Sequence, residues 1–252
     1  MTAVFKDYFS KQSTDYAKYR PSYPDELFEY LASLTPHHDA AWDCATGNGQ
    51  VARSLTQWFS SVYATDASEK QIAQAFQHPQ INYRVAPAEA SGLPDQSVDL
   101  ITVGQALHWF NVEQFYSEVK RVLKPTGVLA VWCYGLFNLP DASNTVQQEV
   151  QSFYDLVEPF WPPERDIVRN QYRTLPFPFQ ELRLPPFAMT LDWAADNLIG
   201  YLITWSATQR FAEEHGWEAI ATFADRLKAA WGDPNTLRTV QWPLSFRIGR
   251  LA

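Results

Sequence analysis

Apolar runs and amphipathic runs alternate along the chain between residues 39 and 134. The apolar runs are short and almost continuous, which is typical of strands that are buried on both faces of a sheet. The runs between them carry apolar residues at helical spacing. We therefore predict strands at 40–44, 61–65, 81–86, 98–104 and 127–134, and helices at 48–59, 68–77 and 111–123. This alternation predicts an α/β fold with a doubly wound, mostly parallel sheet.

The pattern changes after Tyr134, where aromatic residues and prolines become frequent. One helix is predicted at 143–158, with loops over the rest of 136–180. Further along, the pattern predicts a strand at 187–193, helices at 194–214 and 223–231, and a final strand at 238–249. We expect this final strand to lie at an edge of the sheet, because Pro243 cannot donate a ladder hydrogen bond.

Two glycines separated by one residue follow the first predicted strand. Gly47 and Gly49 lack a Cβ and let backbone N–H groups approach a ligand, and the helix that follows presents unpaired N–H donors at its start. Asp66 ends the second predicted strand, roughly 20 residues after the glycines, which is the spacing at which nucleotide-binding folds place an acid on the ribose hydroxyls. Together these features predict a nucleotide-type cofactor rather than a plain strand-to-helix turn.

Two classes of cofactor fit this loop. Residues 47–52 match the dinucleotide fingerprint G-x-G-x-x-A, which indicates a nicotinamide dinucleotide and an oxidoreductase. Asp43 ends the first strand, however, and its carboxylate would repel a pyrophosphate and favour a cation. S-adenosylmethionine has no phosphate and carries a sulfonium and an ammonium group, so Asp43 favours this cofactor. The dinucleotide remains the alternative.

Residues 43–50 resemble the first motif of the class I S-adenosylmethionine-dependent methyltransferases, D-x-G-x-G-x-G, with Ala45 in place of the first glycine. Asp66 matches the ribose-binding acid of that family. The pair Ala88-Glu89 matches the segment beside the adenine, although Pro87 stands where the family often has an aspartate.

The resemblance covers roughly residues 15–135 and continues through the stretches 93–99 and 121–127. His108-Trp109-Phe110 and the early stretch 19–24 are similar to the methyltransferase type 11 group, which includes trans-aconitate methyltransferase-like proteins. The resemblance implies a Rossmann-like, seven-stranded sheet with a cap inserted after the fifth strand. We therefore expect an N-terminal helical segment over the cofactor site at 1–38, a cofactor-binding core at 39–135, the inserted cap at 136–180 and completion of the sheet by 181–252.

Topology and resemblance together indicate the cofactor site. Doubly wound sheets bind ligands at the carboxyl ends of their strands, and the predicted strands carry several candidate residues to that edge. Arg20 could hold a carboxylate of the cofactor or the substrate in bidentate fashion, or could lie on the surface against nearby tyrosines. The predicted cofactor-binding residues are Arg20, Asp43, Ala45, Gly47, Gly49, Asp66, Ala67, Ala88, Glu89 and Gln105.

His108 follows the fourth predicted strand, where an acceptor would meet the methyl group. It could act as a general base, since its ordinary pKa is about 6.5, or it could be a structural histidine. The Asn/Asp-Pro-Pro-Tyr-type sequence of enzymes that methylate amino groups of bases is absent from 104–110. In the expected cap, Arg165, Arg169 and Arg173 recur at i+4 spacing and would share one helix face. They could bind an anionic substrate, but the sequence favours a solvated basic face.

Composition and charge exclude several other functions. The formal net charge of −8 and the lack of a dense basic run disfavour nucleic acid as a partner. Cys44 and Cys133 offer neither metal-ligand spacing nor a disulfide framework, so no metal site is expected. No apolar run is long enough for a membrane span, and the N-terminus lacks the apolar region of a signal peptide. We therefore expect a cytoplasmic protein without a membrane partner.

These observations predict an enzyme that transfers the methyl group of S-adenosylmethionine to a small-molecule acceptor and releases S-adenosylhomocysteine. The acceptor atom is expected to be an oxygen of a carboxylate or a hydroxyl. A carboxylate needs no general base, whereas a hydroxyl needs one, for which His108 or a tyrosine of the cap is the first candidate. A catalytically silent protein that binds the cofactor is a further alternative. The sequence specifies neither the acceptor nor the oligomeric state.

Overall fold

The computed structural model describes residues 21–251, and the structural statements below concern this part of the chain. An eight-stranded sheet has the order β3-β2-β1-β4-β5-β8-β6, with β7 paired to β8 outside this path. Strands β1 to β5 are parallel, and β8 is antiparallel to β5. The strands are β1 Ala40–Cys44, β2 Ser61–Asp66, β3 Ile81–Val85, β4 Val98–Gly104, β5 Leu123–Tyr134, β6 Gln180–Glu181, β7 Ala188–Trp193 and β8 Arg238–Arg250. The order reverses between β1 and β4, which favours a ligand site at their carboxyl ends.

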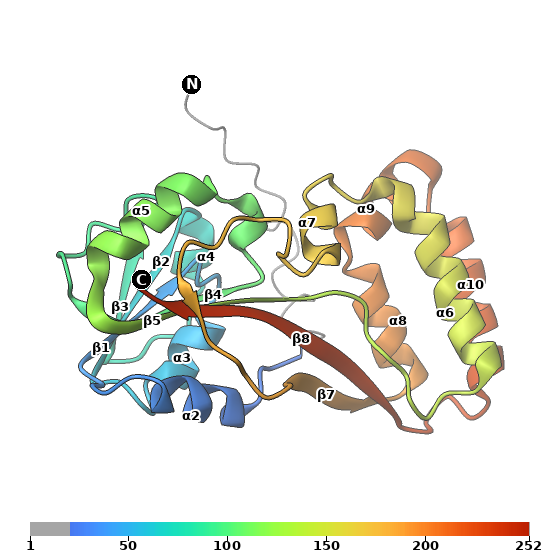
Figure 1. The fold of residues 1–252 in the computed structure, drawn as a ribbon. Coiled ribbons are helices and arrows are strands. Elements are labelled where there is room, and N and C mark those ends of the chain that lie inside the picture. Colours follow the sequence, from blue (N-terminus) through green and yellow to red (C-terminus); the bar gives the residue numbers. More distant parts are fainter. Residues whose placement is uncertain (1–20, 252) are drawn as a thin grey trace.

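Helices cover both faces of the sheet, with α5 on one face and α2 and α3 on the other (Figure 1). In β5, Ala130 and Trp132 pack in the cluster that contains α2 and α3, whereas Leu129 and Val131 pack in the cluster that contains α5. The helices of this core are α2 Asp25–Ser33, α3 Gln50–Leu55, α4 Glu69–Ala73, the 3-10 helix η1 Leu107–Trp109 and α5 Val112–Val122. The structure thus confirms the predicted doubly wound α/β fold.

A second group of helices lies beside the core and is called the helical lobe here (Figure 1). It comes from two separate stretches of chain. The first contains α6 Asn144–Val157, the 3-10 helix η2 Glu158–Phe160 and α7 Arg165–Arg169, and the second contains α8 Ala195–Ile203, α9 Ser206–His215 and α10 Glu218–Trp231. Helices α6 and α10 join the two stretches, because Phe153 stacks on Phe223 with ring centroids 4.2 Å apart. The helices of 195–231 therefore extend the cap predicted at 136–180.

Strand β8 connects the core with the helical lobe (Figure 1). Its first half pairs with β7 up to Pro243, and its second half pairs with β5 from Leu244 onward. The prediction of an edge strand is wrong for the second half, which lies between β5 and β6. Pro243 is tolerated because it stands where the pairing changes from β7 to β5, so the missing N–H interrupts neither ladder.

The helix predicted at 194–214 is two helices, α8 and α9, because the chain is extended at Trp205. The buried Trp205 ring packs against Phe153, Trp161 and Tyr201 in the centre of the lobe. None of the helices in 21–251 is long and apolar enough to cross a lipid bilayer.

Candidate functional site

The loop between β1 and α3 has a left-handed backbone at three positions. The φ angle is 56° at Ala45, 57° at Gly47 and 86° at Gly49. Glycine adopts such angles at little cost, whereas a residue with a Cβ is strained there. Ala45 therefore lies at a position that favours glycine. The methyltransferase motif that residues 43–50 resemble has a glycine at this position. A Cβ at Gly49 would also clash with the Tyr83 hydroxyl on β3, so the shape of this loop requires a glycine there.

Asp43, at the end of β1, is fully buried below this loop. Its Oδ2 accepts hydrogen bonds from the Thr46 hydroxyl at 2.5 Å and from the Ala52 N–H at 3.1 Å. Its Oδ1 accepts one from the Thr102 hydroxyl on β4 at 2.9 Å. Burial raises the pKa of this carboxyl to about 7. The sequence placed Asp43 against the methionine end of the cofactor, but the geometry gives its side chain a positioning role, because it joins the loop, α3 and β4.

Asp66, at the end of β2, holds the same loop from the other side. Its Oδ2 accepts a hydrogen bond from the Gly47 N–H at 2.9 Å, and its Oδ1 accepts one from the Ser68 N–H at 2.8 Å. The side chain is half-buried, and burial raises its pKa. Each carboxylate oxygen has a second lone pair, so Asp66 keeps the capacity to accept further hydrogen bonds from a ligand. The neighbouring Ala67 is exposed.

The loop after β3 brings Ala88 and Glu89 to the same edge of the sheet. Ala88 is buried, and Glu89 is half-buried. The Oε1 atom of Glu89 accepts a hydrogen bond from the backbone N–H of Asn111 at 2.8 Å, directly before α5. A carboxylate is favourable at a helix N-terminus because of the helix dipole. Glu89 therefore fixes the loop after β3 against the start of α5.

Gln105 follows β4 and joins it to β5. Its Nε2 donates to the Tyr134 carbonyl at 3.0 Å, and its Oε1 accepts from the Tyr134 N–H at 2.8 Å. Its φ angle is 55°, in the left-handed region. A strained backbone of this kind persists where the surrounding structure determines it. The amide of Gln105 thus shapes the site by holding the ends of β4 and β5 together.

His108 lies in η1 and contacts Tyr172, a fully buried residue beyond α7. Its Nδ1 is 3.1 Å from the Tyr172 hydroxyl, and the backbone N–H groups of Leu107 and His108 face that hydroxyl oxygen. The hydroxyl and Nδ1 share one hydrogen bond, and the tautomer of the ring decides which of them donates. Burial, followed by the charge of Arg165, lowers the pKa of His108 to about 3. The neutral ring is a poor general base.

The three arginines with i+4 spacing do not share a face. Helix α7 ends at Arg169, and Arg173 lies beyond it, exposed to solvent. Arg169 forms an ion pair with Glu158 at 2.5 Å and donates to the Tyr154 hydroxyl at 2.8 Å. Arg165 is half-buried and stacks on Trp161. The prediction of a continuous solvated basic face is therefore wrong for Arg165.

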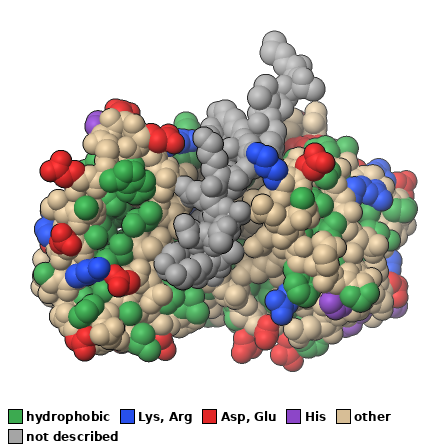
Figure 2. Space-filling view, turned by 180° about the vertical axis from the view of Figure 1, so that it is seen from behind, with side chains coloured by type: hydrophobic (Ala, Val, Ile, Leu, Met, Phe, Trp, Pro, Cys, Tyr) green, Lys and Arg blue, Asp and Glu red, His purple; other side chains and the backbone are tan. Residues whose placement is uncertain are grey.

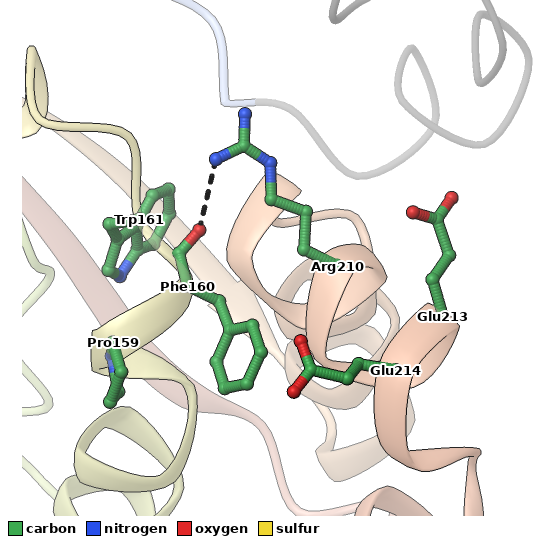
Figure 3. Close-up of a pocket in the computed structure, with 6 residues that line it drawn as sticks. All are labelled: Pro159, Phe160, Trp161, Arg210, Glu213 and Glu214. Carbon is green, nitrogen blue, oxygen red and sulfur yellow. Dashed lines mark hydrogen bonds between the residues drawn. The ribbon is translucent and has the colours of Figure 1, made fainter.

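A hollow of about 480 Å³ opens between η2 and α9 in the helical lobe (Figure 3). Arg210 donates a hydrogen bond to the Phe160 carbonyl across it at 3.3 Å. The lining residues are Pro159, Phe160, Trp161, Arg210, Glu213 and Glu214. None of them is a predicted cofactor-binding residue, and none belongs to the strand-end site, which consists of the loops that follow β1, β2, β3 and β4.

The strand-end site has the chemistry that S-adenosylmethionine requires. Asp66 offers free acceptor capacity for a ribose diol, and a Cβ placed on Gly47 would meet open space within 4 Å. Arg20 was also predicted to lie here, but it falls outside the described residues. The sequence analysis missed Tyr172, for which the sequence offers no signal, and Thr46 and Thr102, which hold Asp43.

Comparisons with known proteins identify the family of this chain. Residues 42–131 match the family model described as a methyltransferase domain. A candidate methyltransferase from Dictyostelium discoideum is 31% identical over 229 residues, which are 90% of this chain and 87% of that protein. A solved structure of a candidate type II methyltransferase from Anaeromyxobacter dehalogenans is 42% identical, with a TM-score of 0.85 over 92% of this chain and 97% of the other.

A more distant solved structure shares the fold. It is a candidate methyltransferase from Bacillus halodurans C-125, 20% identical, with a TM-score of 0.53 over 90% of this chain and 97% of the other. The similarity over almost the whole chain favours S-adenosylmethionine over the nicotinamide dinucleotide as the cofactor. The glycine loop and the strand order are those of the class I S-adenosylmethionine-dependent methyltransferases. Together with the relatives from Dictyostelium and Anaeromyxobacter, they show that the chain belongs to this family.

Proposed function

We propose that the protein methylates an oxygen of a small-molecule acceptor, and that this oxygen attacks without first losing a proton to the enzyme. The state of His108 carries the proposal. Its Nδ1 lies 3.1 Å from the Tyr172 hydroxyl, and burial lowers the pKa of the ring to about 3. A hydroxyl acceptor needs a base whose pKa is close to the working pH. A carboxylate is already ionised at neutral pH and needs none.

The roles of the cofactor-site residues are part of the same proposal. S-adenosylmethionine supplies an activated methyl group on a sulfonium, and in-line attack by the acceptor oxygen forms the O–C bond as the S–C bond breaks. Asp66 would accept hydrogen bonds from the ribose hydroxyls, and the loop at Gly47 would lie against the cofactor. Ala88 and Glu89 would border the adenine. Asp43 and Gln105 would act indirectly by fixing the loops, which supplies the positioning that methyl transfer needs.

The charge of the protein supports a small molecule over a nucleic acid. The chain carries a formal net charge of −8. Lysine and arginine side chains are scattered singly over the face in Figure 2 and form no continuous basic patch on its described part. Nucleic acids bind through phosphates, which require a positive surface.

The test is a methyl-transfer assay over matched acceptors. The purified protein is incubated with S-adenosylmethionine and with carboxylic acids, the corresponding alcohols, and the corresponding amines, and both S-adenosylhomocysteine release and product mass are measured. We expect methyl esters from one or more acids. Turnover of amines alone, or of alcohols alone, would contradict the proposed acceptor chemistry while leaving the methyltransferase family intact.

A further inference from the structure

Arg165 begins α7, a helix that packs against η1 and against β5, where the Cys133 thiol lies 3.9 Å from the Val168 carbonyl. Its guanidinium lies over the Trp161 ring, 4.6 Å from the ring centroid. The pKa of His108, just after β4, is lowered first by burial and then by the charge of Arg165. The same charge acts on the thiol of Cys133, near the end of β5. Because such effects weaken with distance, Arg165 lies close to the place where an acceptor would meet the methyl group.

The charge of Arg165 has no acidic partner. No carboxylate in residues 21–251 forms an ion pair with it, although Arg169, one turn later, is paired with Glu158. Burial lowers the pKa of the Arg165 guanidinium, and smaller opposing effects come from Tyr154, Tyr201 and Tyr134. Removing a cation from water is costly unless it is paired. A partner from solution would supply the missing negative charge.

Two buried donors in this turn of chain also lack acceptors. Within the described part of the chain, neither Nε of Arg165 nor Nε1 of Trp161 has a hydrogen-bond partner. The Oε2 atom of Glu164, the residue between α7 and Pro163, is buried and unpartnered as well, so Glu164 does not satisfy either donor. Buried polar groups in proteins are normally hydrogen-bonded. The unsatisfied donors of Arg165 and Trp161 therefore indicate a binding site for a ligand with acceptor oxygens.

We propose that Arg165, together with the indole N–H of Trp161, binds an anionic oxygen group of the methyl acceptor, a carboxylate or a phosphate. Stacking on Trp161 fixes the plane of the guanidinium and leaves its N–H groups free to form paired hydrogen bonds to such a group. The neutral His108 ring, whose Nδ1 lies 3.1 Å from the Tyr172 hydroxyl, would add no positive charge beside the acceptor. The inference rests on the proposed function, because it takes the ligand to be the acceptor.

The test uses four variants of the full chain. Arg165→Met removes the charge at similar volume, Arg165→Lys keeps the charge but loses the planar fork, and Trp161→Phe keeps a ring but loses the N–H. Arg173→Met is the matched control, because this exposed arginine forms no ion pair in the described chain. Circular dichroism and the affinity for S-adenosylhomocysteine, measured by calorimetry, show that each variant is folded.

The probes are a set of carboxylic acids, each with its neutral amide, and a set of organic phosphates, each with its parent alcohol. Thermal shifts of the complex with S-adenosylhomocysteine identify the probes that bind, and calorimetry gives their affinities. We expect an acid or a phosphate to bind while its neutral counterpart does not. Its affinity should fall about 10- to 100-fold in Arg165→Met, as for loss of a charged hydrogen-bonding group, less in Arg165→Lys and Trp161→Phe, and not at all in Arg173→Met.

Three results would overturn the inference. The first is that no anionic probe binds more tightly than its neutral counterpart. The second is that Arg165→Met binds the anionic probes as well as the wild type does. The third is a loss of about tenfold or more in S-adenosylhomocysteine affinity in Arg165→Met, which would assign the arginine to the cofactor carboxylate. Binding of acids through Arg165 without any methyl ester would leave the inference standing and refute the proposed function instead.

Discussion

Replacing Asp66 with asparagine tests the assignment of the ribose-binding acid. The asparagine side chain has the same shape but loses the charge, and one of its two terminal atoms becomes an NH₂ donor. In the wild type, one carboxylate oxygen accepts from the Gly47 N–H and the other from the Ser68 N–H. Alanine would remove both acceptors and distort the loop, so asparagine separates ligand binding from loop structure more cleanly.

The expected loss follows from the hydrogen bonds at stake. A hydrogen bond to a charged group contributes about 1.5–3 kcal/mol, and the amide group can accept from only one side. Losing one such bond to the ribose should cost about 2 kcal/mol, which is about a 30-fold weaker affinity. The fold should also lose about 1 kcal/mol, because either Gly47 or Ser68 is left with an unpaired N–H.

Calorimetric titration with S-adenosylhomocysteine measures the first quantity, and denaturant unfolding measures the second. Glu69→Gln is the matched control, since Glu69 is an exposed acid in the first turn of α4 and carries the same charge. We expect the control to bind with unchanged affinity. If Asp66→Asn were folded and bound S-adenosylhomocysteine as tightly as the wild type, Asp66 would not contact the ribose and the geometric reasoning would be wrong.

Three further predictions concern other parts of the site. Burial raises the pKa of Asp43 from 3.8 to about 7, so its contribution to stability is full below the unfolded pKa and is lost as the pH rises through the folded value. Asp43→Asn should therefore weaken the fall in melting temperature between about pH 4 and pH 7, and equal slopes in both proteins would contradict this. Gly49→Ala should destabilise the fold by more than the roughly 1–2 kcal/mol of a left-handed backbone, because of the Tyr83 hydroxyl. Gly47→Ala, at a φ of 57° in open space in the same loop, should show the backbone cost without a steric clash in denaturant unfolding, and equal losses would remove the steric argument. With the pKa of His108 lowered to about 3, kcat/KM of Asp43→Asn, which lacks the carboxyl with a pKa of about 7, should be flat between about pH 6 and pH 8. A step near about 6.5 in that variant would indicate an ordinary histidine base.

The sheet could be predicted because burial on both faces leaves a plain signal in the sequence. Strands β1 and β4 have the predicted bounds, 40–44 and 98–104. Helix α3 was predicted at 48–59 but spans Gln50–Leu55, since the next residues continue in tighter turns, with Thr56 N–H donating to the Arg53 carbonyl. Apolar periodicity cannot distinguish such turns from a regular helix.

The positions of the site residues could be predicted better than their roles. The strand order brings Asp43 and Asp66 to the same edge, as expected from the doubly wound pattern. The direction of each side chain depends on partners far away in sequence. Thr102, 59 residues from Asp43, turns that carboxylate inward. Tyr172, 64 residues from His108, holds the imidazole ring through a hydrogen bond to Nδ1.

The three arginines at i+4 spacing show why periodicity in the sequence does not predict where a charged side chain lies. An uninterrupted helix would have aligned Arg165, Arg169 and Arg173, but left-handed residues at Gln171 and Tyr172, with φ of 55° and 60°, redirect the chain after α7. Two such residues in succession are strained, and burial of the Tyr172 ring against His108 offsets that cost. The same turn that positions the histidine thus separates Arg173 from Arg165. The neutral histidine and the lack of a carboxylate partner for Arg165 within residues 21–251 both favour an acceptor that carries a negative charge.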